Sequence, residues 1–394
     1  MDITFKFKYK NKKYYMRALI LIMFYCCTNL VQLFGNENCF YFHGIKIAFV
    51  DFLNNSKGNG ALQEEEDIVR SECIKLYFNK IKTEYELDNW ATISLIRSYV
   101  KYKYPDSNSI RYNLELFYYV KSLDFSCTLL RSENNKSYVV GVRCADKEIS
   151  MIKIDENPYY LLSSNIKDKL EVIELHFSDT QISFNWGALP KLPVKETMSI
   201  ERAVFFKDSL YRFRFVNNEF LMGYLSEIPI SNLQEYDTLR FYRTSSFYDQ
   251  NLKQIHTAIS NFSDWDKLSF ILMLVQSLNY IDDIDQFEQE RIMSPELTLY
   301  LAGGDCDDKT SLLADLINRF IPSKILLITY PGKNHMNLAV SLPRIPCEEC
   351  LMINYINQRY IILEPSGQYY PIGSMGNNDV NYLENYFVHF YVQN

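Results

Sequence analysis

The chain has 394 residues, of which 47% are hydrophobic and 23% are charged, a balance typical of globular proteins and not of disordered ones. This length predicts two or three domains. The net charge of −7 at pH 7 argues against a nucleic-acid-binding protein, because such proteins need a concentrated basic surface.

The N-terminal segment, residues 1–44, has the features of a signal peptide or a membrane anchor. The basic stretch KFKYKNKKYYMR precedes the apolar stretch ALILIMFYCCTNLVQLF, residues 18–34. This pattern predicts an exported or membrane-anchored protein of the periplasm or cell envelope, whose membrane contact is limited to this segment. No A-x-A-like cleavage site follows, so cleavage stays open, and a buried first helix is the alternative.

The next predicted domain, residues 45–165, is α+β. After a polar linker at 54–67, apolar residues recur at helical spacing in EEEDIVRSECIKLYFNKI and WATISLIRSYVKYKY. From residue 128 the pattern shortens to strands, with a hairpin around ENNKS followed by EISMIKID. Residues 166–248 continue in this way, and we expect a separate β-rich domain there.

The last predicted domain, residues 249–394, starts with helices and ends with strands. DKLSFILMLVQSLNYI and DKTSLLADLINRF have helical spacing, whereas KILLITY, MNLAVSL and RYIILEP are short apolar runs bounded by turn residues. The whole chain therefore belongs to the α+β class.

The 45–165 and 249–394 segments resemble each other in the order of their elements. An offset of 197 residues, with one gap, aligns Ser109 with Cys306, Ser137 with His335 and Asp155 with Glu364. The first segment is then a degenerate repeat without nucleophile and base. The alternative is coincidence, because helix–strand–strand units are common.

The stretch GGDCDDKT, residues 303–310, places a cysteine at the start of a helix. Asp305 is a suitable N-cap, and Asp307 and Asp308 complement the helix dipole in the first turn. Cys306 then lies in that turn, where backbone N–H groups stabilise a thiolate and can donate to an oxyanion. Because three acids surround the thiol, it needs a base.

The base and an orienting acid are predicted at equal spacing along the chain. His335 follows the turn PGKN, opens the strand MNLAVSL and lies 29 residues after Cys306. Glu364 lies another 29 residues on, at the end of an otherwise apolar strand. A nucleophile, a base and an acid at such junctions are typical of a Cys-His-acid triad.

Four motifs, VQSLNYIDD, MSPELTLYLAGGDCDDKTSLLADLI, PGKNHMNLAV and YIILEPS, resemble the bacterial and archaeal transglutaminase-like domain, a papain-related cysteine-protease fold, over about residues 250–375. The resemblance implies Cys306 as nucleophile, His335 as base and Glu364 as third member. It also implies an enzyme that acts on protein or peptide amides through a thioester acyl-enzyme. Hydrolysis makes it a cysteine peptidase or amidase, and acyl transfer makes it a transglutaminase.

Several features depart from that family or stay open. Many transglutaminases have aspartate where Glu364 stands, and Asp307 replaces the tryptophan that follows the cysteine in animal transglutaminases, which puts protein crosslinking in doubt. Gln276 is either an oxyanion donor or a polar residue on an exposed helix face. The proposed chemistry needs no metal or organic cofactor, the partner is a protein or peptide substrate, and the oligomeric state is not indicated.

Two other functions compete with the enzyme. One is a non-catalytic binding or scaffold protein of the cell envelope that keeps the fold. The other makes Cys347 and Cys350 a redox pair, but the strand–CxxC–helix context that is usual for such pairs is missing there. At this spacing a local disulfide or two unreactive thiols are favoured over a zinc site. Asp282, Asp283 and Asp285 lack EF-hand spacing, so we expect a solvated helix end there.

Overall fold

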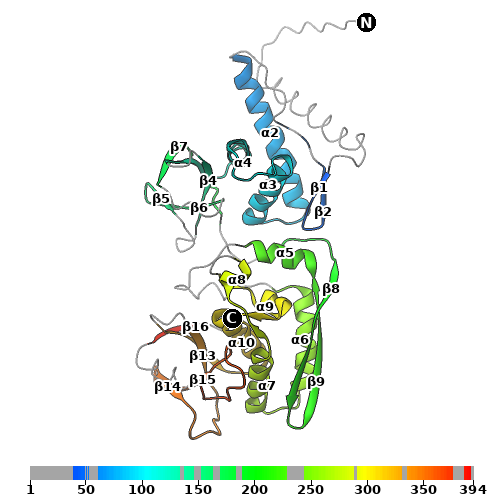
Figure 1. The fold of residues 1–394 in the computed structure, drawn as a ribbon, viewed down its shortest axis with the longest axis vertical. Coiled ribbons are helices and arrows are strands. Elements are labelled where there is room, and N and C mark those ends of the chain that lie inside the picture. The colour runs from blue at the N-terminus through cyan, green and yellow to red at the C-terminus, as the bar shows by residue number, and fades with distance from the viewer. Residues whose placement is uncertain are drawn as a thin grey trace. The chain divides into compact units, whose positions relative to one another are not determined.

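The computed structural model describes residues 39–48, 50, 52, 61–133, 137–145, 152–162, 169–182, 189–228, 244–287, 291–330, 335–375 and 386–391. The chain divides into two compact units (Figure 1). Residues 1–183 with 190–192 form unit 1, and residues 184–189 with 193–394 form unit 2. Both units contain helices and strands, so the predicted α+β class is confirmed.

The described part of unit 1 begins with a short antiparallel hairpin and three helices. These are β1 (Cys39–Phe42), β2 (Ile45–Ala48), α2 (Ala61–Glu84), α3 (Asn89–Lys103) and α4 (Ile110–Ser122). Capping side chains start the second and third helices. Asp88 accepts from the N–H of Ala91 (2.7 Å), and Ser109 accepts from the N–H of Tyr112 (3.2 Å).

A five-stranded antiparallel sheet completes unit 1. Its strands are β3 (Cys127–Ser132), β4 (Tyr138–Arg143), β5 (Ile152–Ile154), β6 (Asn157–Leu161) and β7 (Leu170–His176). They lie in the order β5-β6-β4-β3-β7, and α4 packs on β3 and β4. The hairpin predicted around ENNKS is therefore confirmed as β3 and β4.

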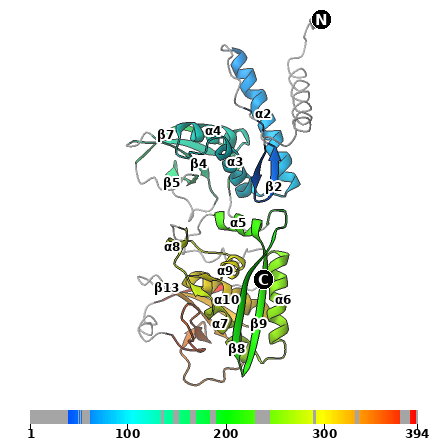
Figure 2. The ribbon, with the colours of Figure 1, turned by 45° about the vertical axis from the view of Figure 1, so that its right-hand side comes forward.

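Unit 2 begins with a long hairpin and continues into helices. Its first elements are β8 (Glu196–Phe206), β9 (Ser209–Asn218), α5 (Glu219–Glu227), α6 (Ser246–Ile259), α7 (Asp264–Gln276), β10 (Asn279–Tyr280), α8 (Asp283–Phe287), α9 (Pro295–Leu301), β11 (Gly303–Gly304) and α10 (Cys306–Phe320). Figures 1 and 2 both show the hairpin alongside α6. Its alternate residues Val204, Phe213 and Phe215 are buried in the same core as α6, α7 and α10.

The second sheet of five antiparallel strands completes unit 2. Its strands are β12 (Lys324–Tyr330), β13 (His335–Ser341), β14 (Met352–Tyr355), β15 (Gln358–Leu363) and β16 (Phe387–Tyr391), in the order β14-β15-β13-β12-β16. Ile325 and Leu327 join the core that contains α10, whereas Leu326 and Ile328 join a smaller core on the other face. Because both faces are covered, KILLITY is apolar at nearly every position.

The two units share one order of elements. In each, a capped helix is followed by an antiparallel hairpin and three further strands, and the strand order across the sheet is the same. The residues that start or follow the matching elements differ in chemistry. Ile110 matches Cys306, Tyr138 matches His335 and Leu162 matches Glu364.

The residue alignment expected from the offset of 197 is shifted. Ser109 is the N-cap of α4 and Ser137 precedes β4, so each lies one residue before the matching position. Asp155 lies in the two-residue turn between β5 and β6 and not at the end of β6. In unit 2 the acid, Glu364, follows β15, which is the strand after the matching turn. The sequence offset placed Asp155 in the turn and not after the strand.

Residues 166–248 do not form a compact unit of their own in the described part of the chain. β7 pairs with β3 and completes the sheet of unit 1, whereas β8, β9 and α5 belong to unit 2. The expected boundary at 165 falls between two strands of one sheet. Strand-like sequence predicts β7, β8 and β9, but it also predicts a strand at FLMGYL, residues 220–225, which lie in helix α5 instead. Such sequence also carries no information about which core each strand joins.

The signal or anchor segment is expected at 1–44, and its basic and apolar stretches lie outside the described residues. Residues 39–44, at the end of that expected segment, belong to the hairpin of β1 and β2, where the ring of Phe40 lies 5.7 Å from that of Tyr99. Helix α2 begins at Ala61, inside the linker expected at 54–67. Among the described helices, none has the length and apolar character needed to cross a membrane.

Candidate active site

The candidate nucleophile lies in the first turn of α10, and paired acids start this helix. Asp305 and Asp308 form a capping box in which the N–H of Asp305 donates to Asp308 Oδ2 (3.4 Å). The N–H of Met293 donates to Asp308 Oδ1 (2.6 Å). A methyl group at Gly304 would approach Asp308 Cβ to 2.7 Å, so this glycine makes room for the capping carboxylate.

The first turns of α10 contact the main chain at the start of β13. Thr310 Oγ1 donates to the carbonyl oxygen of Met336 (3.3 Å), and the N–H of Met336 hydrogen-bonds to Cys306. Pairing of β13 with β15 covers only Leu338–Val340, so Met336 lies beyond the paired stretch. The helix start therefore occupies this open edge, and the thiol lies against the residue that follows His335.

The environment of Cys306 favours the protonated thiol. The residue is 7% exposed. Burial raises the pKa of the thiol above its usual range, and the charges of Asp307 and Asp305 raise it further, whereas the Met336 N–H lowers it. A thiol in this state becomes a nucleophile only when a base takes its proton.

His335 and Glu364 are brought together across the sheet. His335 Nε2 lies 2.9 Å from Glu364 Oε2, and Glu364 Oε1 accepts hydrogen bonds from the N–H (3.1 Å) and the hydroxyl of Ser366. Burial raises the pKa of Glu364, but the hydrogen bonds and charge of His335 and the bonds from Ser366 outweigh it and lower the pKa. The ring of Tyr330 stacks on His335 with centroids 5.8 Å apart. A charged carboxylate therefore orients the imidazole.

Gln276, at the end of α7, holds the main chain that carries Glu364. It is 4% exposed, and its Nε2 donates to the carbonyl oxygens of Glu364 (2.9 Å) and Tyr370 (2.8 Å). The exposed-face interpretation of Gln276 is therefore wrong. Its predicted oxyanion role would require one of these two bonds to open, because both amide protons are donated.

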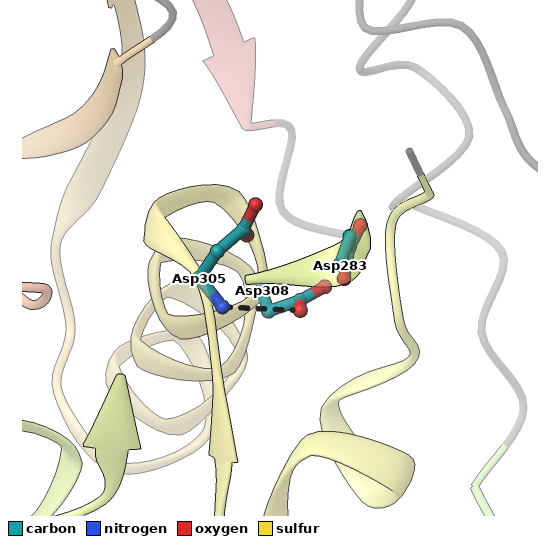
Figure 3. A group of neighbouring side chains, drawn as sticks. All are labelled: Asp283, Asp305 and Asp308. Carbon is teal, nitrogen blue, oxygen red and sulfur yellow. Dashed lines mark hydrogen bonds between the residues drawn. The ribbon is translucent and has the colours of Figure 1, made fainter. Parts of the chain in front are cut away.

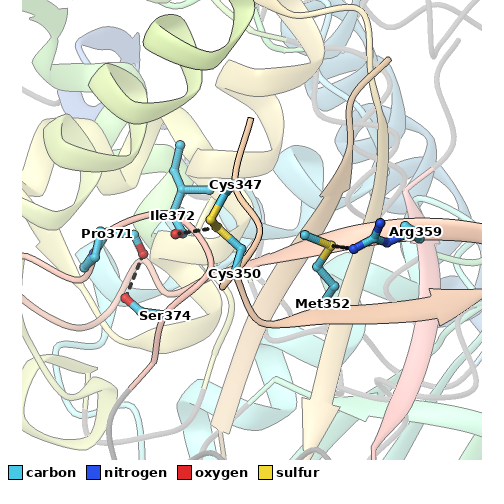
Figure 4. The surroundings of a disulfide bond; sticks show 7 residues. All are labelled: Cys347, Cys350, Met352, Arg359, Pro371, Ile372 and Ser374. Atoms are coloured by element: carbon cyan, nitrogen blue, oxygen red, sulfur yellow. Dashed lines mark hydrogen bonds between the residues drawn. A yellow bond between two sulfur atoms is a disulfide. The ribbon is translucent and has the colours of Figure 1, made fainter. Parts of the chain in front are cut away.

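A disulfide holds the same loop from another side. Cys347 and Cys350 are joined, and Cys350 Sγ lies 3.4 Å from the carbonyl oxygen of Ile372 (Figure 4). A methyl group at Gly373 would meet Cys350 Cβ at 2.3 Å, so the two segments are in close contact. This packing favours a structural disulfide over a redox pair, and the loop that follows Glu364 is held on two sides.

Three carboxylates form a group at the start of α10 (Figure 3). Asp283, Asp305 and Asp308 each bring one oxygen within 4.8 Å of the others, a spacing at which carboxylates can hold a cation. However, Asp283 Oδ2 accepts from the N–H of Arg291 (2.7 Å), and both oxygens of Asp308 accept main-chain N–H groups. Burial raises the pKa of Asp308 well above its usual range. These features favour a hydrogen-bonded network over a metal site.

The helix end expected to be solvated is only partly so. Asp282 and Asp285 are exposed, but Asp283 is 1% exposed. The N–H of Arg291, eight residues further along the chain, donates to Asp283, and no local sequence pattern predicts this contact.

Two side chains near the site were not predicted from the sequence. Tyr280 pairs with Gly304 across β10 and β11, and 57% of the residue is exposed. Partial burial of its hydroxyl, followed by the charge of Cys306, raises the pKa of Tyr280, so the hydroxyl stays a hydrogen-bond donor. Lys309 is 1% exposed. Burial lowers the pKa of Lys309 to about 8, and the charge of Glu364 opposes this shift. The first is one of 31 tyrosines. The second has the usual sequence context of a solvated helix residue, so neither carried a signal.

No protein-family model matches the chain, and a comparison with curated proteins finds no match either. The function is therefore inferred from the geometry of the site.

Replacing Gln276 by methionine tests whether its amide holds the loop. The change leaves the buried carbonyl group of Glu364 and the partly buried one of Tyr370 without this donor. We expect a loss of ~1–3 kcal/mol in the free energy of unfolding, measured with urea. The matched control is Gln254→Met on the surface of α6. Gln254 also makes two hydrogen bonds to main-chain groups, since it accepts from the N–H of Arg214 and donates to its carbonyl oxygen. Equal losses in the two variants would contradict the assignment.

Replacing Asp307 by asparagine tests the buried acids. Burial, before all else, raises the pKa of Asp307 well above its usual range, and its Oδ1 accepts from the N–H of Asp308 (2.9 Å). An acid whose pKa is higher in the folded than in the unfolded state stabilises the fold at low pH. That stability is lost as the pH rises above ~4.

Asparagine mimics the protonated acid at every pH. We expect Asp307→Asn to be more stable than the parent by roughly 1–2 kcal/mol at pH 8, with the difference disappearing near pH 4. Urea unfolding at both pH values measures it. A difference that does not change with pH would show that Asp307 is charged in both states.

Proposed function

We propose that the chain is a transglutaminase-like cysteine enzyme that acts on amide bonds of proteins or peptides. The observation that carries the proposal is the bond of His335 to Glu364, next to the main-chain contact of Cys306 with residue 336. Nucleophile, base and orienting acid come from three separate elements, α10, β13 and the end of β15, as such a triad requires.

The first half of the reaction forms a thioester. Cys306 Sγ attacks the amide carbonyl carbon while its proton passes to His335 Nδ1, the ring nitrogen not directed at Glu364. The main-chain N–H groups in the first turn of α10 donate to the developing oxyanion. His335 then protonates the leaving amine, the C–N bond breaks, and the acyl group stays on sulfur.

The second half releases the acyl group. Water or an amine attacks the thioester while His335 takes its proton, and that proton returns to the thiolate when the C–S bond breaks. Water makes the enzyme a peptidase or amidase, and an amine makes it a transglutaminase. Tyr280, whose raised pKa keeps its hydroxyl protonated, is a hydrogen-bond donor at this side of the site.

The order of elements in unit 2 supports the transglutaminase-like, papain-related fold. A helix with cysteine in its first turn packs on an antiparallel sheet, one strand starts with the histidine, and another ends before the acid. The shared strand order also supports our proposal that unit 1 is a degenerate copy. The basic stretch followed by the apolar stretch 18–34 supports our proposal that the protein is exported or anchored at the cell envelope.

A non-catalytic binding or scaffold protein is the second candidate. The observation in its favour is the raised pKa of Cys306, which burial and neighbouring acids keep in the neutral form. In unit 1 the positions that match the triad are already occupied by Ile110, Tyr138 and Leu162. If the triad of unit 2 is also inactive, neither unit is catalytic and the chain consists of two binding domains.

Alkylation of Cys306 in the full chain separates these candidates. Peptide mass spectrometry follows labelling by iodoacetamide from pH 5 to pH 10. With His335 as base, the rate should rise through pH ~6–7, where imidazoles titrate. In His335→Ala the rise should move above pH ~9, because burial raises the pKa of the thiol, and labelling at pH 7 should fall ~100-fold.

His256→Ala provides the control, because His256 is an exposed residue of α6. Its profile should match that of the parent. If His335→Ala also matches the parent, the enzyme proposal fails and the binding protein takes its place.

A further inference from the structure

Tyr330 and His335 lie opposite each other at the end of the hairpin of β12 and β13. They are direct partners in the register of the two strands, and their rings are nearly parallel, at 20°, with centroids 5.8 Å apart. Stacked rings at this separation attract each other. The phenol ring therefore covers one face of the imidazole, whereas the Nε2 edge of the imidazole is bound by Glu364.

The phenol ring of Tyr330 is itself held in place. Only 3% of the residue is exposed, and it belongs to the same small core as Leu326 and Ile328. Its hydroxyl donates to Asn337 Oδ1 (3.0 Å) in the interior of the protein. Because Asn337 follows His335 by two residues on β13, these two side chains lie on one face of the sheet, the face on which Tyr330 packs.

Asn337 is an unusual residue for its place in the fold. It is 0% exposed in a strand whose residues 336–341 are all buried, and its Nδ2 has no hydrogen-bond partner among the described residues. A buried amide nitrogen without a partner is destabilising, so the packing of the strand does not account for this side chain. The bond that its Oδ1 accepts from Tyr330 does account for it.

We infer that Tyr330 and Asn337 are positioning residues of this site. Asn337 fixes the phenol ring of Tyr330, and this ring fixes the plane of the His335 imidazole. The inference rests on the proposed function, because it assigns both residues a role toward the proposed base. Neither residue has to contact the substrate.

The bond from His335 to Glu364 does not by itself fix the plane of the imidazole. It holds one ring nitrogen, and a hydrogen bond tolerates a departure of about 30° from linearity. A tilt within that range displaces Nδ1, the nitrogen that takes the proton of Cys306 in the proposed reaction. Since a displacement of about 1 Å in a reacting group can cost ~100-fold in rate, a covering ring that restricts the tilt contributes to the reaction.

The test is the alkylation of Cys306 by iodoacetamide in the full chain, measured at pH 7 and at pH 10. At pH 7 labelling depends on His335, whereas at pH 10 hydroxide removes the thiol proton without it. In Tyr330→Leu we expect the rate at pH 7 to fall about tenfold relative to the rate at pH 10. Tyr330→Phe keeps the ring but loses the bond to Asn337, and there we expect a fall of about threefold.

Tyr360→Leu is the matched control. Tyr360 is 2% exposed and belongs to the same small core, but it lies on β15, where the neighbouring Ile361 pairs with Val340. That position is far along β13 from His335, so the loss of this ring should leave the ratio of the two rates unchanged. An equal fall in Tyr360→Leu and Tyr330→Leu would show that the core sets the ratio and not the stack, and it would overturn the inference.

Other results also decide against the inference. A parent ratio in Tyr330→Leu means that the ring does not act on the base, and faster labelling at both pH values means that it only keeps Cys306 buried. A parent ratio in Tyr330→Phe overturns the role of Asn337. If Tyr330→Leu does not fold, Tyr330→Phe decides alone, and the parent ratio there overturns the whole inference.

Failure of the proposed function gives a different result. In that case the parent has the same ratio of rates as His335→Ala, and the roles of Tyr330 and Asn337 are refuted with the function. A parent that differs from His335→Ala but matches Tyr330→Leu leaves the proposed function intact and overturns the inference alone.

Discussion

The contact between the first turns of α10 and the open edge of β13 is the constraint on which the site depends. Met336 presents an N–H and a carbonyl group beyond the stretch that β15 pairs. A buried main-chain group without a partner costs ~1–3 kcal/mol, so both need one. Cys306 and Thr310 are those partners. The packing requirement and the proposed chemistry therefore select the same geometry, in which the thiol lies beside the residue after His335.

The acids of GGDCDDKT follow from the same helix start. Asp305 and Asp308 cap α10, and they lie close enough to Asp283 that a full set of charges would be costly. Raised pKa values of Asp307 and Asp308 reduce that cost, because a protonated carboxyl carries no charge. The field that opposes a thiolate at Cys306 is then smaller than the number of acids suggests.

Local sequence rules predicted most elements but not the helix α5, and they predicted the partners of the elements poorly. The run KILLITY matches β12 residue for residue, and the helix predicted from 308 starts at Cys306, because apolar spacing and capping residues act locally. The pairing of His335 with Glu364 followed from their places at strand ends. Gln276 could not be placed, because the face it uses is decided by a loop about ninety residues away. The same holds for residues 166–248, whose strands join two different cores.

Active-site titration with p-nitrophenyl acetate tests the central claim most directly. This activated ester acylates a competent cysteine without knowledge of the natural substrate. We predict a burst of about one p-nitrophenol per full chain, with an acetyl group on the peptide that contains Cys306, and no burst in Cys306→Ala. Slow linear release, equal in parent and variant and without acetylation of Cys306, would contradict the assignment of a nucleophile at the start of α10.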